Sequence, residues 1–370
     1  MRIVHLIDNL DCGGAEQVVT SLAIHQSLQG HSVRVVCLRD VGPQPVNVPE
    51  LAKAGVEIVP LEKPPGLHLG TLRKLTAYLK GQRIEVVHTH NHLVHHYGAI
   101  AARWAGAPAV LNTLHGTATL QIPYWAKALY WLSCSISDRV VCVCRQVHEI
   151  FSKTFHLPSR KLCVVDNGID LARFLQIPRR PADKTVTFGK IGRLDPVKDH
   201  RNLLKAFAIL SGKHPNVNLR LLGDGALRQD LEELSKTLSI SDKVHFEGFS
   251  LDTPRFLGSI NIFVISSRSE GLPLTLLEAM GAALPVVATA VGEIPDILGN
   301  AKCGWVCPPA DPEELAEVME QALLAPDLAT IGARGRSVVL ERYSLDRMAR
   351  DYERLYKEIL SGNTIQSNHS

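Results

Sequence analysis

Short runs of apolar and β-branched residues alternate with amphipathic stretches along the whole chain. A strand buried on both faces appears as a continuous apolar run, whereas a helix places apolar residues three or four positions apart. The alternation therefore predicts an α/β protein built from βαβ units around parallel sheets. Strands are expected at 3–7, 32–38, 57–60, 86–89, 109–113, 139–143, 162–165, 185–191, 218–222, 244–246, 260–265 and 285–288. Helices are expected near 15–28, 69–81, 93–105, 125–133, 146–154, 201–210, 227–238, 274–280, 312–323, 326–342 and 345–360.

A turn-rich stretch separates two such alternations. Residues 166–184 contain an Asn-Gly pair, two prolines and three arginines without clear periodicity, which predicts a linker or hinge. We therefore expect two doubly wound, Rossmann-like domains, residues 1–170 and 171–344, that face each other across a cleft. The last amphipathic segment lies within 345–370 and needs a surface to pack on, while the polar end of the chain is expected to fray.

The composition is that of an ordinary globular protein and argues against several functional classes. Hydrophobic residues make up 45% of the chain, and 40 basic against 37 acidic side chains leave a net charge of +3, without the electrostatic pattern of a nucleic-acid-binding protein. Neither a secretory signal nor a membrane span is recognised, so we expect a cytoplasmic location. Eight cysteines without a C-x-x-C pair indicate reduced thiols and no zinc or redox motif.

The first candidate site follows the first expected strand. Gly13 and Gly14 stand at the start of a helix, where a phosphate or sugar oxygen can approach backbone N–H groups at the positive end of the helix dipole. A glycine pair at such a turn can equally serve tight geometry alone. The fingerprint G-x-G-x-x-G is absent here and also after Gly223, which argues against a dinucleotide cofactor.

The second candidate site follows the first strand of the second domain. Arg193 and Lys198 lie between that strand and the next helix, where two fixed cations can neutralise a diphosphate leaving group without a metal. Taken alone, the same pattern also fits two solvated surface cations beside a helix cap.

The most specific pattern pairs two glutamates around the start of a helix. Glu270 follows a hydrophobic strand, and Glu278 comes two helical turns later, after the turn and helix start at 271–274. Carboxylates accept paired hydrogen bonds from vicinal diols such as those of a ribose or hexose. Together with Arg193 and Lys198, the pair predicts a site for a charged, hydroxyl-rich ligand.

A histidine cluster offers a metal site as an alternative. His88, His90 and His92 fall on one face if the strand continues, and His115 is expected to lie nearby. Three imidazoles can ligate zinc, but no cysteine or carboxylate completes a ligand set at recognisable spacing. We therefore expect no metal, and we expect His90, at the end of its strand, to face the acceptor side of the cleft.

These motifs together resemble those of the retaining nucleotide-sugar glycosyltransferases of family 4, which have the two-domain GT-B fold. The resemblance covers nearly the whole chain, and the segment that carries Glu270 and Glu278 is its most diagnostic part. Two departures are visible: Asp199 and His200 stand after Lys198 where many relatives have Gly, and Asp166 precedes Asn167 where Pro is common. The resemblance rests on the segments 13–16, 114–116, 167–170, 192–198, 223–225 and 270–287.

The resemblance implies roles for individual residues. The C-terminal domain binds the nucleotide sugar, the N-terminal domain binds the acceptor, and the last helix returns to the N-terminal domain. Arg193 and Lys198 hold the diphosphate, Glu278 the ribose and Glu270 the donor sugar, with His115 at the reacting sugar. The implied catalytic residues are His115, Arg193, Lys198 and Glu270; the donor-binding residues are Gly13, Gly14, Arg193, Lys198, Gly223, Glu270, Gly271, Leu272, Pro273, Leu274 and Glu278; the acceptor-binding residues are Glu16, His90 and His115.

The resulting hypothesis is an enzyme that transfers a hexose-type sugar, with retention, from a nucleoside diphosphate sugar to a hydroxyl of a glycan or glycolipid. A uridine donor is favoured over guanosine, and neither a cofactor nor a metal is expected. A nucleotide-sugar epimerase of the same fold and an inactive partner subunit stay as alternatives. The aromatic segment 124–132 and the basic residues near 73–83 suit peripheral contact with an anionic membrane or, equally, ordinary packing and solvation.

Overall fold

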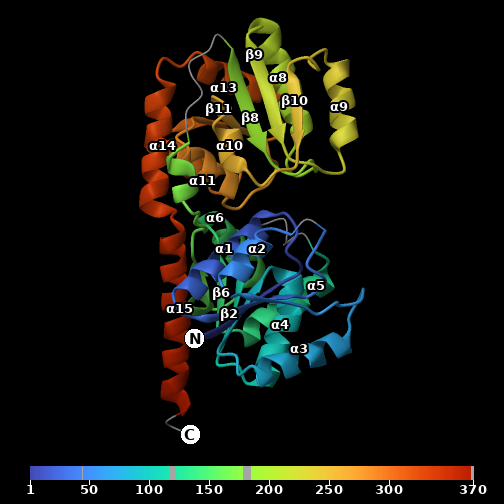
Figure 1. Cartoon of the computed structure of the whole chain (residues 1–370), viewed down its shortest axis with the longest axis vertical. Helices are drawn as coiled ribbons and strands as arrows, with labels where there is room; N and C mark the ends of the chain where they lie inside the picture. Colours follow the sequence, from blue (N-terminus) through green and yellow to red (C-terminus); the bar gives the residue numbers. More distant parts are fainter. Residues whose placement is uncertain (44, 117–121, 178–184, 368–370) are drawn as a thin grey trace. The chain divides into compact units, whose positions relative to one another are not determined.

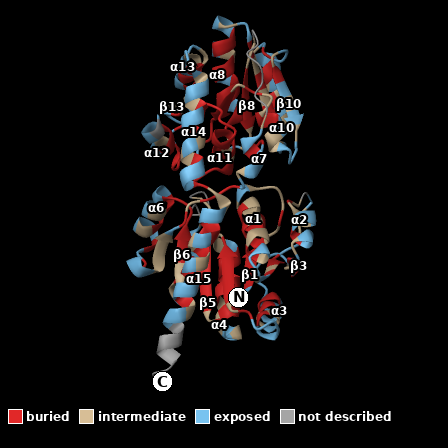
Figure 2. Cartoon of the chain, turned by 60° about the vertical axis from the view of Figure 1, so that its left-hand side comes forward, coloured by how far each residue is buried: buried red, intermediate tan, exposed pale blue. Residues whose placement is uncertain are grey.

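The computed structural model describes residues 1–43, 45–116, 122–177 and 185–367 (Figure 1). By their internal packing these residues form two units, one of residues 1–168 together with the segment from Leu345 onward, the other of Ile169–Ser344. Each unit is a parallel sheet covered by helices, and the central strands are buried while the outer helix faces are exposed (Figure 2). The first unit ends at Gly168 and the second begins at Ile169, whereas the sequence analysis divides the chain after Asp170.

The first unit contains a seven-stranded parallel sheet in the order β3-β2-β1-β4-β5-β6-β7. The chain proceeds from β1 towards one edge and from β4 towards the other, so the strand order reverses between β1 and β4. His5 of β1 pairs in register with His88 of β4. The strands are β1 (Arg2–Ile7), β2 (Ser32–Cys37), β3 (Glu57–Pro60), β4 (Val86–His90), β5 (Ala109–Leu114), β6 (Arg139–Cys142) and β7 (Leu162–Val164).

Strand periodicity gives the two faces of this sheet different characters. Val4 and Leu6 point into an apolar core that contains residues of α3 and α4. His5, between them, points to the other face, where its ring meets Gln26 of α1. The long helix α15 also packs on α1 and contacts β5. The helices are α1 (Gly14–Leu28), α2 (Val48–Lys53), α3 (Leu69–Gly81), α4 (His92–Ala105), α5 (Tyr124–Ile136), α6 (Arg145–Phe155) and α15 (Leu345–Ser367).

The second unit contains a six-stranded parallel sheet in the order β10-β9-β8-β11-β12-β13, which reverses between β8 and β11. Its main apolar core joins β8, β9 and β11 to α8, α9 and α13. The strands are β8 (Val186–Ile191), β9 (Val217–Leu222), β10 (Val244–Gly248), β11 (Ile262–Ile265), β12 (Val286–Thr289) and β13 (Gly304–Cys307). The helices are α7 (Ala172–Leu175), α8 (His200–Lys213), α9 (Arg228–Thr237), α10 (Thr253–Leu257), α11 (Leu274–Gly281), α12 (Ile294–Ala301), α13 (Pro312–Leu323) and α14 (Leu328–Arg342).

The expected linker needs a correction. Within 166–184 the structure places the short helix α7, which contacts α11, and Ile169 forms a bridge with Ser344. This part of the stretch is packed because the Phe174 side chain is buried, and a single apolar residue among turn-forming residues gives little signal in the sequence. Residues 178–184 lie outside the described residues. Sequence reasoning also missed α2, α10 and α12, each of which has Pro in its first turn.

Candidate functional site

The candidate site of the second unit lies where its strand order reverses. Open α/β sheets bind ligands at the carboxyl ends of their strands, next to such a reversal. The loop after β8 carries Arg193 and Lys198, and the loop after β11 carries Glu270. Because β8 and β11 are neighbours, two motifs that are more than seventy residues apart in sequence meet at one edge of the sheet.

Lys198 and Glu270 form a partly buried ion pair at this edge. The Lys198 Nζ lies 2.7 Å from Oε1 of Glu270, and the side chains are 25% and 11% exposed. The Ser267 hydroxyl donates a second hydrogen bond, also of 2.7 Å, to the same carboxylate oxygen. Lys198, which is predicted to bind the diphosphate, therefore contacts Glu270, which is predicted to bind the sugar. This contact holds both charged groups in place.

A buried lysine beneath the pair ties the two loops together. Lys190 of β8 is fully buried, and its Nζ donates to the Lys198 carbonyl oxygen at 2.7 Å and to Ser266 Oγ at 2.8 Å. Burial, together with the neighbouring positive charge of Lys198, lowers the pKa of Lys190 to about 7, and the negative charge of Glu270 opposes this shift. Lys190 thus fixes the backbone that presents Lys198.

The two predicted cations occupy different environments. The Arg193 guanidinium is 67% exposed and lies 3.2 Å from Asp195 Oδ2. The other oxygen of Asp195 accepts a 3.0 Å hydrogen bond from the backbone N–H of Lys198. Asp195 therefore connects the two cations, with Lys198 held in the loop and Arg193 extending into solvent.

The first departure from the family pattern has a structural explanation. Asp199 has φ +44°, in the left-handed region where glycine is favoured, and it caps α8 through a hydrogen bond from the Asn202 N–H. Its other carboxylate oxygen accepts from Arg268 Nε at 2.7 Å. The next residue, His200, is buried, and burial next to Lys190 lowers its pKa to about 2. Asp199 thus replaces glycine by using its side chain to hold the strained position.

The helix start after Glu270 is packed tightly into the unit. Residues 271–274 are all buried, and the carbonyl oxygen of Gly271 accepts a 3.0 Å hydrogen bond from the Glu293 N–H. Glu278, on α11, is 2% exposed. The residue predicted to bind the ribose is therefore a buried carboxylate and not a solvated helix residue. Burial of a carboxylate is more typical of a positioned binding group than of a surface charge.

Gly223 has a structural role of its own. Its φ of +145° suits glycine, and a Cβ there would overlap the carbonyl oxygen of Gly192. The loops after β8 and β9 pass this closely because Gly223 has no side chain. Gly223 therefore shapes the edge that carries Arg193, whatever it also does toward a ligand.

In the first unit, Gly13, Gly14 and Glu16 lie together at the start of α1. Gly13 is the N-cap residue in an extended conformation, and a Cβ there would overlap the carboxylate of Glu16. Gly14 has open space around the position of a Cβ. The carboxylate of Glu16 thus lies against the turn at the positive end of the helix, where the sequence analysis predicts an anion or sugar oxygen.

The histidine cluster differs from the expected one. Asn91 has φ +65° and ends β4, so His92 begins α4 and does not continue the face of His88 and His90. The third imidazole comes from His5 of the neighbouring strand β1. Ligand atoms of His5, His88 and His90 lie within 4.8 Å of one another, a spacing that a metal ion would also suit.

His90 does not face an open surface, contrary to expectation. It is 1% exposed, and its ring nitrogens contact His5 Nδ1 at 3.1 Å and His115 Nε2 at 3.0 Å. His115 follows β5 and is the outermost of the three hydrogen-bonded histidines His5, His90 and His115. Any effect of His90 on a ligand therefore passes through His115.

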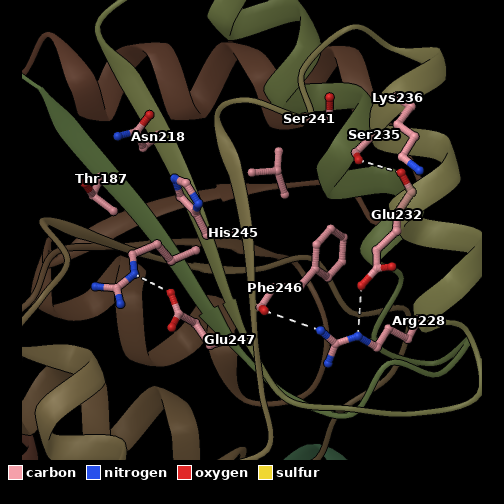
Figure 3. A pocket seen from close by; sticks show the side chains of 12 residues that line it. Thr187, Asn218, Arg228, Glu232, Ser235, Lys236, Ser241, His245, Phe246 and Glu247 are labelled. Carbon is pink, nitrogen blue, oxygen red and sulfur yellow. Dashed lines mark hydrogen bonds and ion pairs between the residues drawn. The ribbon is translucent and has the colours of Figure 1, made fainter.

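A hollow of about 790 Å³ lies elsewhere in the second unit (Figure 3). It is lined by the starts of β8 and β9, by β10 and by α9, and it contains none of the predicted site residues. Ion pairs of Arg220 with Glu247 and of Arg228 with Glu232 occupy its walls. The hollow lies away from the carboxyl ends of β8 and β11, where the predicted site residues gather.

Family comparisons match most of the chain in two adjoining segments. Residues 12–173 match the family described as Glycosyltransferase Family 4, and residues 174–336 match Glycosyl transferases group 1. The chain belongs to the family 4 glycosyltransferases. The expected family is confirmed, and the two matches meet at α7, close to the boundary between the units.

Relatives within the wider set of glycosyltransferases have diverse substrates. The chain is 28% identical over 240 residues to a UDP-Gal:alpha-D-GlcNAc-diphosphoundecaprenol alpha-1,3-galactosyltransferase of Escherichia coli, covering 60% of this chain and 62% of that protein. It is 25% identical over 310 residues to an N-acetyl-alpha-D-glucosaminyl L-malate synthase of Bacillus anthracis, covering 80% of each. The match to the first relative thus spans less than two thirds of its length.

Solved structures confirm the GT-B fold of this glycosyltransferase. Anabaena HepE in complex with UDP aligns with a TM-score of 0.83 at 19% identity, covering 97% of this chain and all of that one. Sucrose-phosphate synthase of Thermosynechococcus elongatus aligns with a TM-score of 0.80 at 20% identity, covering 98% of this chain and all of that one. Among the described residues, no helix has the length and apolarity that crossing a membrane requires.

Sequence reasoning missed the buried residues whose hydrogen bonds hold the candidate site residues of this glycosyltransferase in place. These are Lys190, Ser266 and Ser267 in the second unit, and His5 and Gln26 in the first. A usable signal existed for two of them, because Lys190 and His5 interrupt apolar strands, and a polar residue there must find a buried partner. The serines and Gln26 carry no such signal.

Proposed function

We propose that this glycosyltransferase transfers a hexose-type sugar, with retention of anomeric configuration, from a nucleoside diphosphate sugar to a hydroxyl of a glycan or glycolipid. The observation that carries the proposal is the pair of Lys198 and Glu270 at the edge between β8 and β11. It puts a cation suited to a diphosphate beside a carboxylate suited to sugar hydroxyls. A UDP-sugar is the favoured donor, because similar structures include complexes with UDP and with UDP-glucose.

The proposed chemistry needs no metal and no cofactor. A departing diphosphate gains negative charge as its bond to the sugar breaks, and Lys198, held by Glu270, would stabilise that charge. Arg193, whose side chain is 67% exposed, would add a second cation when the donor binds. Glu278 would bind the ribose and Glu270 the sugar. The roles implied for Gly13, Gly14, Glu16 and His115 stay predictions.

Donor binding is the first test. In a thermal-shift series with UDP, GDP, ADP, dTDP and NAD in the presence of EDTA, one diphosphate, expected to be UDP, should raise the melting temperature. The shift should be lost in Glu278→Ala and kept in Lys205→Ala, whose side chain is exposed on α8. A shift with NAD alone, or none at saturating ligand, contradicts the proposed donor site.

Turnover separates the proposal from its two alternatives. An epimerase would convert the donor to a rearranged nucleotide sugar without any acceptor, and a partner subunit would bind the donor without consuming it. A transferase releases the nucleoside diphosphate only when an acceptor hydroxyl or water takes the sugar. The anomeric configuration of the product, measured by proton NMR, tests retention.

We further propose that α5 contacts a membrane surface carrying a lipid-linked acceptor. Tyr124, Trp125, Trp131 and Leu132 are exposed along this helix, and Lys127 is its only charged residue. An exposed apolar face with Trp and Tyr is typical of helices that lie in a membrane interface. A lipid-linked acceptor also appears in the name of the Escherichia coli relative.

Vesicle flotation tests this contact. Wild-type protein should float with vesicles that contain anionic phospholipid, and the double variant Trp125→Ser, Trp131→Ser should not. The variant Leu324→Ser, which removes an equally exposed apolar residue from the second unit, should float like the wild type. Wild-type protein that stays at the bottom of the gradient overturns the proposal.

A further inference from the structure

A continuous row of hydrogen bonds runs from the interior of the first unit to His115. The Gln26 Oε1 lies 2.8 Å from His5 Nε2, His5 Nδ1 lies 3.1 Å from His90 Nε2, and His90 Nδ1 lies 3.0 Å from His115 Nε2. Three secondary-structure elements contribute: α1 carries Gln26, β1 carries His5 and β4 carries His90. The row therefore connects a buried amide to a side chain at the carboxyl end of β5.

His5 and His90 are buried and the rings of this row are hydrogen-bonded to one another, which favours neutral imidazoles, each with one N–H and one lone pair. Burial lowers the pKa of His5 and of His115 to about 4, and burial together with the neighbouring histidines holds the pKa of His90 well below its usual value. A neutral imidazole can donate from only one of its two nitrogens. Each hydrogen bond in the row thus determines the direction of the next.

The amide of Gln26 sets that direction. With its oxygen facing His5, as in the structure, His5 must donate from Nε2 and accept at Nδ1. His90 then donates from Nε2 to His5 and accepts at Nδ1, and His115 donates from Nε2 to His90. The remaining nitrogen of His115, Nδ1, is left with a lone pair and no proton.

That nitrogen is shielded from solvent and has no hydrogen-bond partner among the described residues. A shielded acceptor without a partner is costly, and such groups in native proteins usually meet a ligand or water. We propose that Gln26, acting through His5 and His90, fixes His115 as an acceptor whose Nδ1 binds a hydroxyl group of the sugar substrate. The identity of the ligand rests on the proposed function, but the tautomer does not.

A second set of contacts holds Gln26 in this orientation. Its amide nitrogen lies 3.5 Å from the Tyr356 hydroxyl of α15, and that hydroxyl lies 2.7 Å from His88 Nδ1. The other nitrogen of His88 lies 2.7 Å from Thr113 Oγ1. The amide oxygen is thereby directed to His5 while its nitrogen faces an oxygen that can accept.

A metal ion at the same histidines would have the opposite consequence. To bind His5 Nδ1 and His90 Nε2 together, an ion needs a lone pair on both nitrogens. His90 would then carry its proton on Nδ1 and donate to His115 Nε2, which would place the proton of His115 on Nδ1. The tautomer of His115 therefore distinguishes a hydrogen-bonded row from a metal site.

Nitrogen NMR of protein labelled with ¹⁵N-histidine measures this tautomer directly in the full chain. The His115 signals are assigned from their loss in His115→Gln. In EDTA-treated wild type we expect a protonated Nε2 and an unprotonated Nδ1. Gln26→Glu keeps an oxygen acceptor at the same place, 2.8 Å from His5 Nε2, and should keep the tautomer. Gln26→Leu removes the acceptor and should give a mixture of both tautomers.

Activity supplies a second readout. Sugar transfer should fall in Gln26→Leu and be retained in Gln26→Glu, because the conservative variant preserves the direction of the row. The matched control is His95→Gln, which alters a buried histidine bonded to Thr89 and Ser137 outside the row and should leave the His115 signals unchanged.

Three results would overturn the inference. These are a protonated Nδ1 in the EDTA-treated wild type, an unchanged tautomer in Gln26→Leu, and stoichiometric zinc binding that moves the proton of His115 to Nδ1 at micromolar metal. None of them bears on whether UDP binds the second unit. Conversely, a protein that binds no nucleoside diphosphate but shows the expected tautomers would contradict the proposed function and leave the row intact.

Discussion

The Nζ of Lys198 lies 2.7 Å from Oε1 of Glu270, across the reversal point between β8 and β11. The hydroxyl of Ser267 shares the same carboxylate oxygen. Since both charged groups are largely shielded from water, their attraction is stronger than that of a surface pair, and loss of one partner leaves the other in an unfavourable environment. The pair thus keeps a cation oriented before any substrate arrives.

Removing that cation should abolish most of the turnover. We expect Lys198→Ala to lower kcat by about 10²–10³-fold, the loss seen when one preorganised donor to a developing negative charge is removed. Steady-state release of the nucleoside diphosphate measures the effect. Arg193→Ala should also lower kcat, because its guanidinium can reach the same charge from the solvent side.

The control for this series is Lys205→Ala, which removes an exposed lysine from the adjoining helix α8. Its turnover should equal that of the wild type. Wild-type turnover in Lys198→Ala would refute the assignment, provided that its unfolding curve still shows a folded protein.

Local patterns predicted the elements and the loop motifs, but not the strand order that unites them. The apolar runs located β8 and β11, and the motifs located Lys198 and Glu270. The contacts of Lys190 with Ser266 arise because β8 and β11 are neighbours, and no local pattern specifies which strands pair.

The histidines show the same limit. A strand extended through His92 was a reasonable expectation from the alternation, but the positive φ of Asn91 ended the strand first. His5 stands more than eighty residues away from its partner His90, and only the adjacency of β1 and β4 brings them together. The predicted histidine cluster therefore included His92 and omitted His5, because the local sequence does not show which strands are neighbours.

Gly223 should be intolerant of any side chain. Gly223→Ala places a methyl group against the carbonyl oxygen of Gly192 at a φ of +145°, so we expect the free energy of unfolding to fall by about 1–3 kcal/mol. Urea unfolding measures the change. Gly212→Ala is the matched control, because Gly212 lies in α8 with open space around it, and it should be neutral or stabilising by up to about 1 kcal/mol. Equal stability of the two variants would contradict this account of Gly223.

Buried neutral histidines should make the fold sensitive to acid. Burial lowers the pKa of His95 from 6.5 to about 3, so between these values the unfolded chain binds a proton that the folded chain does not. Stability is therefore lost as the pH falls from 6.5 towards 3, by up to about 1.4 kcal/mol per pH unit for each such histidine. His95→Gln should flatten the measured dependence of unfolding free energy on pH, and His245→Gln, at an exposed position, should not. Parallel curves for His95→Gln and the wild type would disprove the assignment.

Lys190 should produce a second pH dependence, on the alkaline side. Its pKa is lowered from 10.5 to about 7, so between pH 7 and 10.5 the unfolded chain holds a proton that the folded chain has released. The contribution of Lys190 to the free energy of unfolding therefore rises with pH across that window, by up to about 1.4 kcal/mol per pH unit. Lys190→Met lacks the titrating group but fills the space, so the wild type should gain stability relative to it between pH 7 and 9.5 in urea unfolding. Lys205→Met, on the exposed face of α8, should follow the wild type. A constant difference between wild type and Lys190→Met would mean that Lys190 keeps its charge in the folded protein, held by Glu270 and Asp199 against the cost of burial.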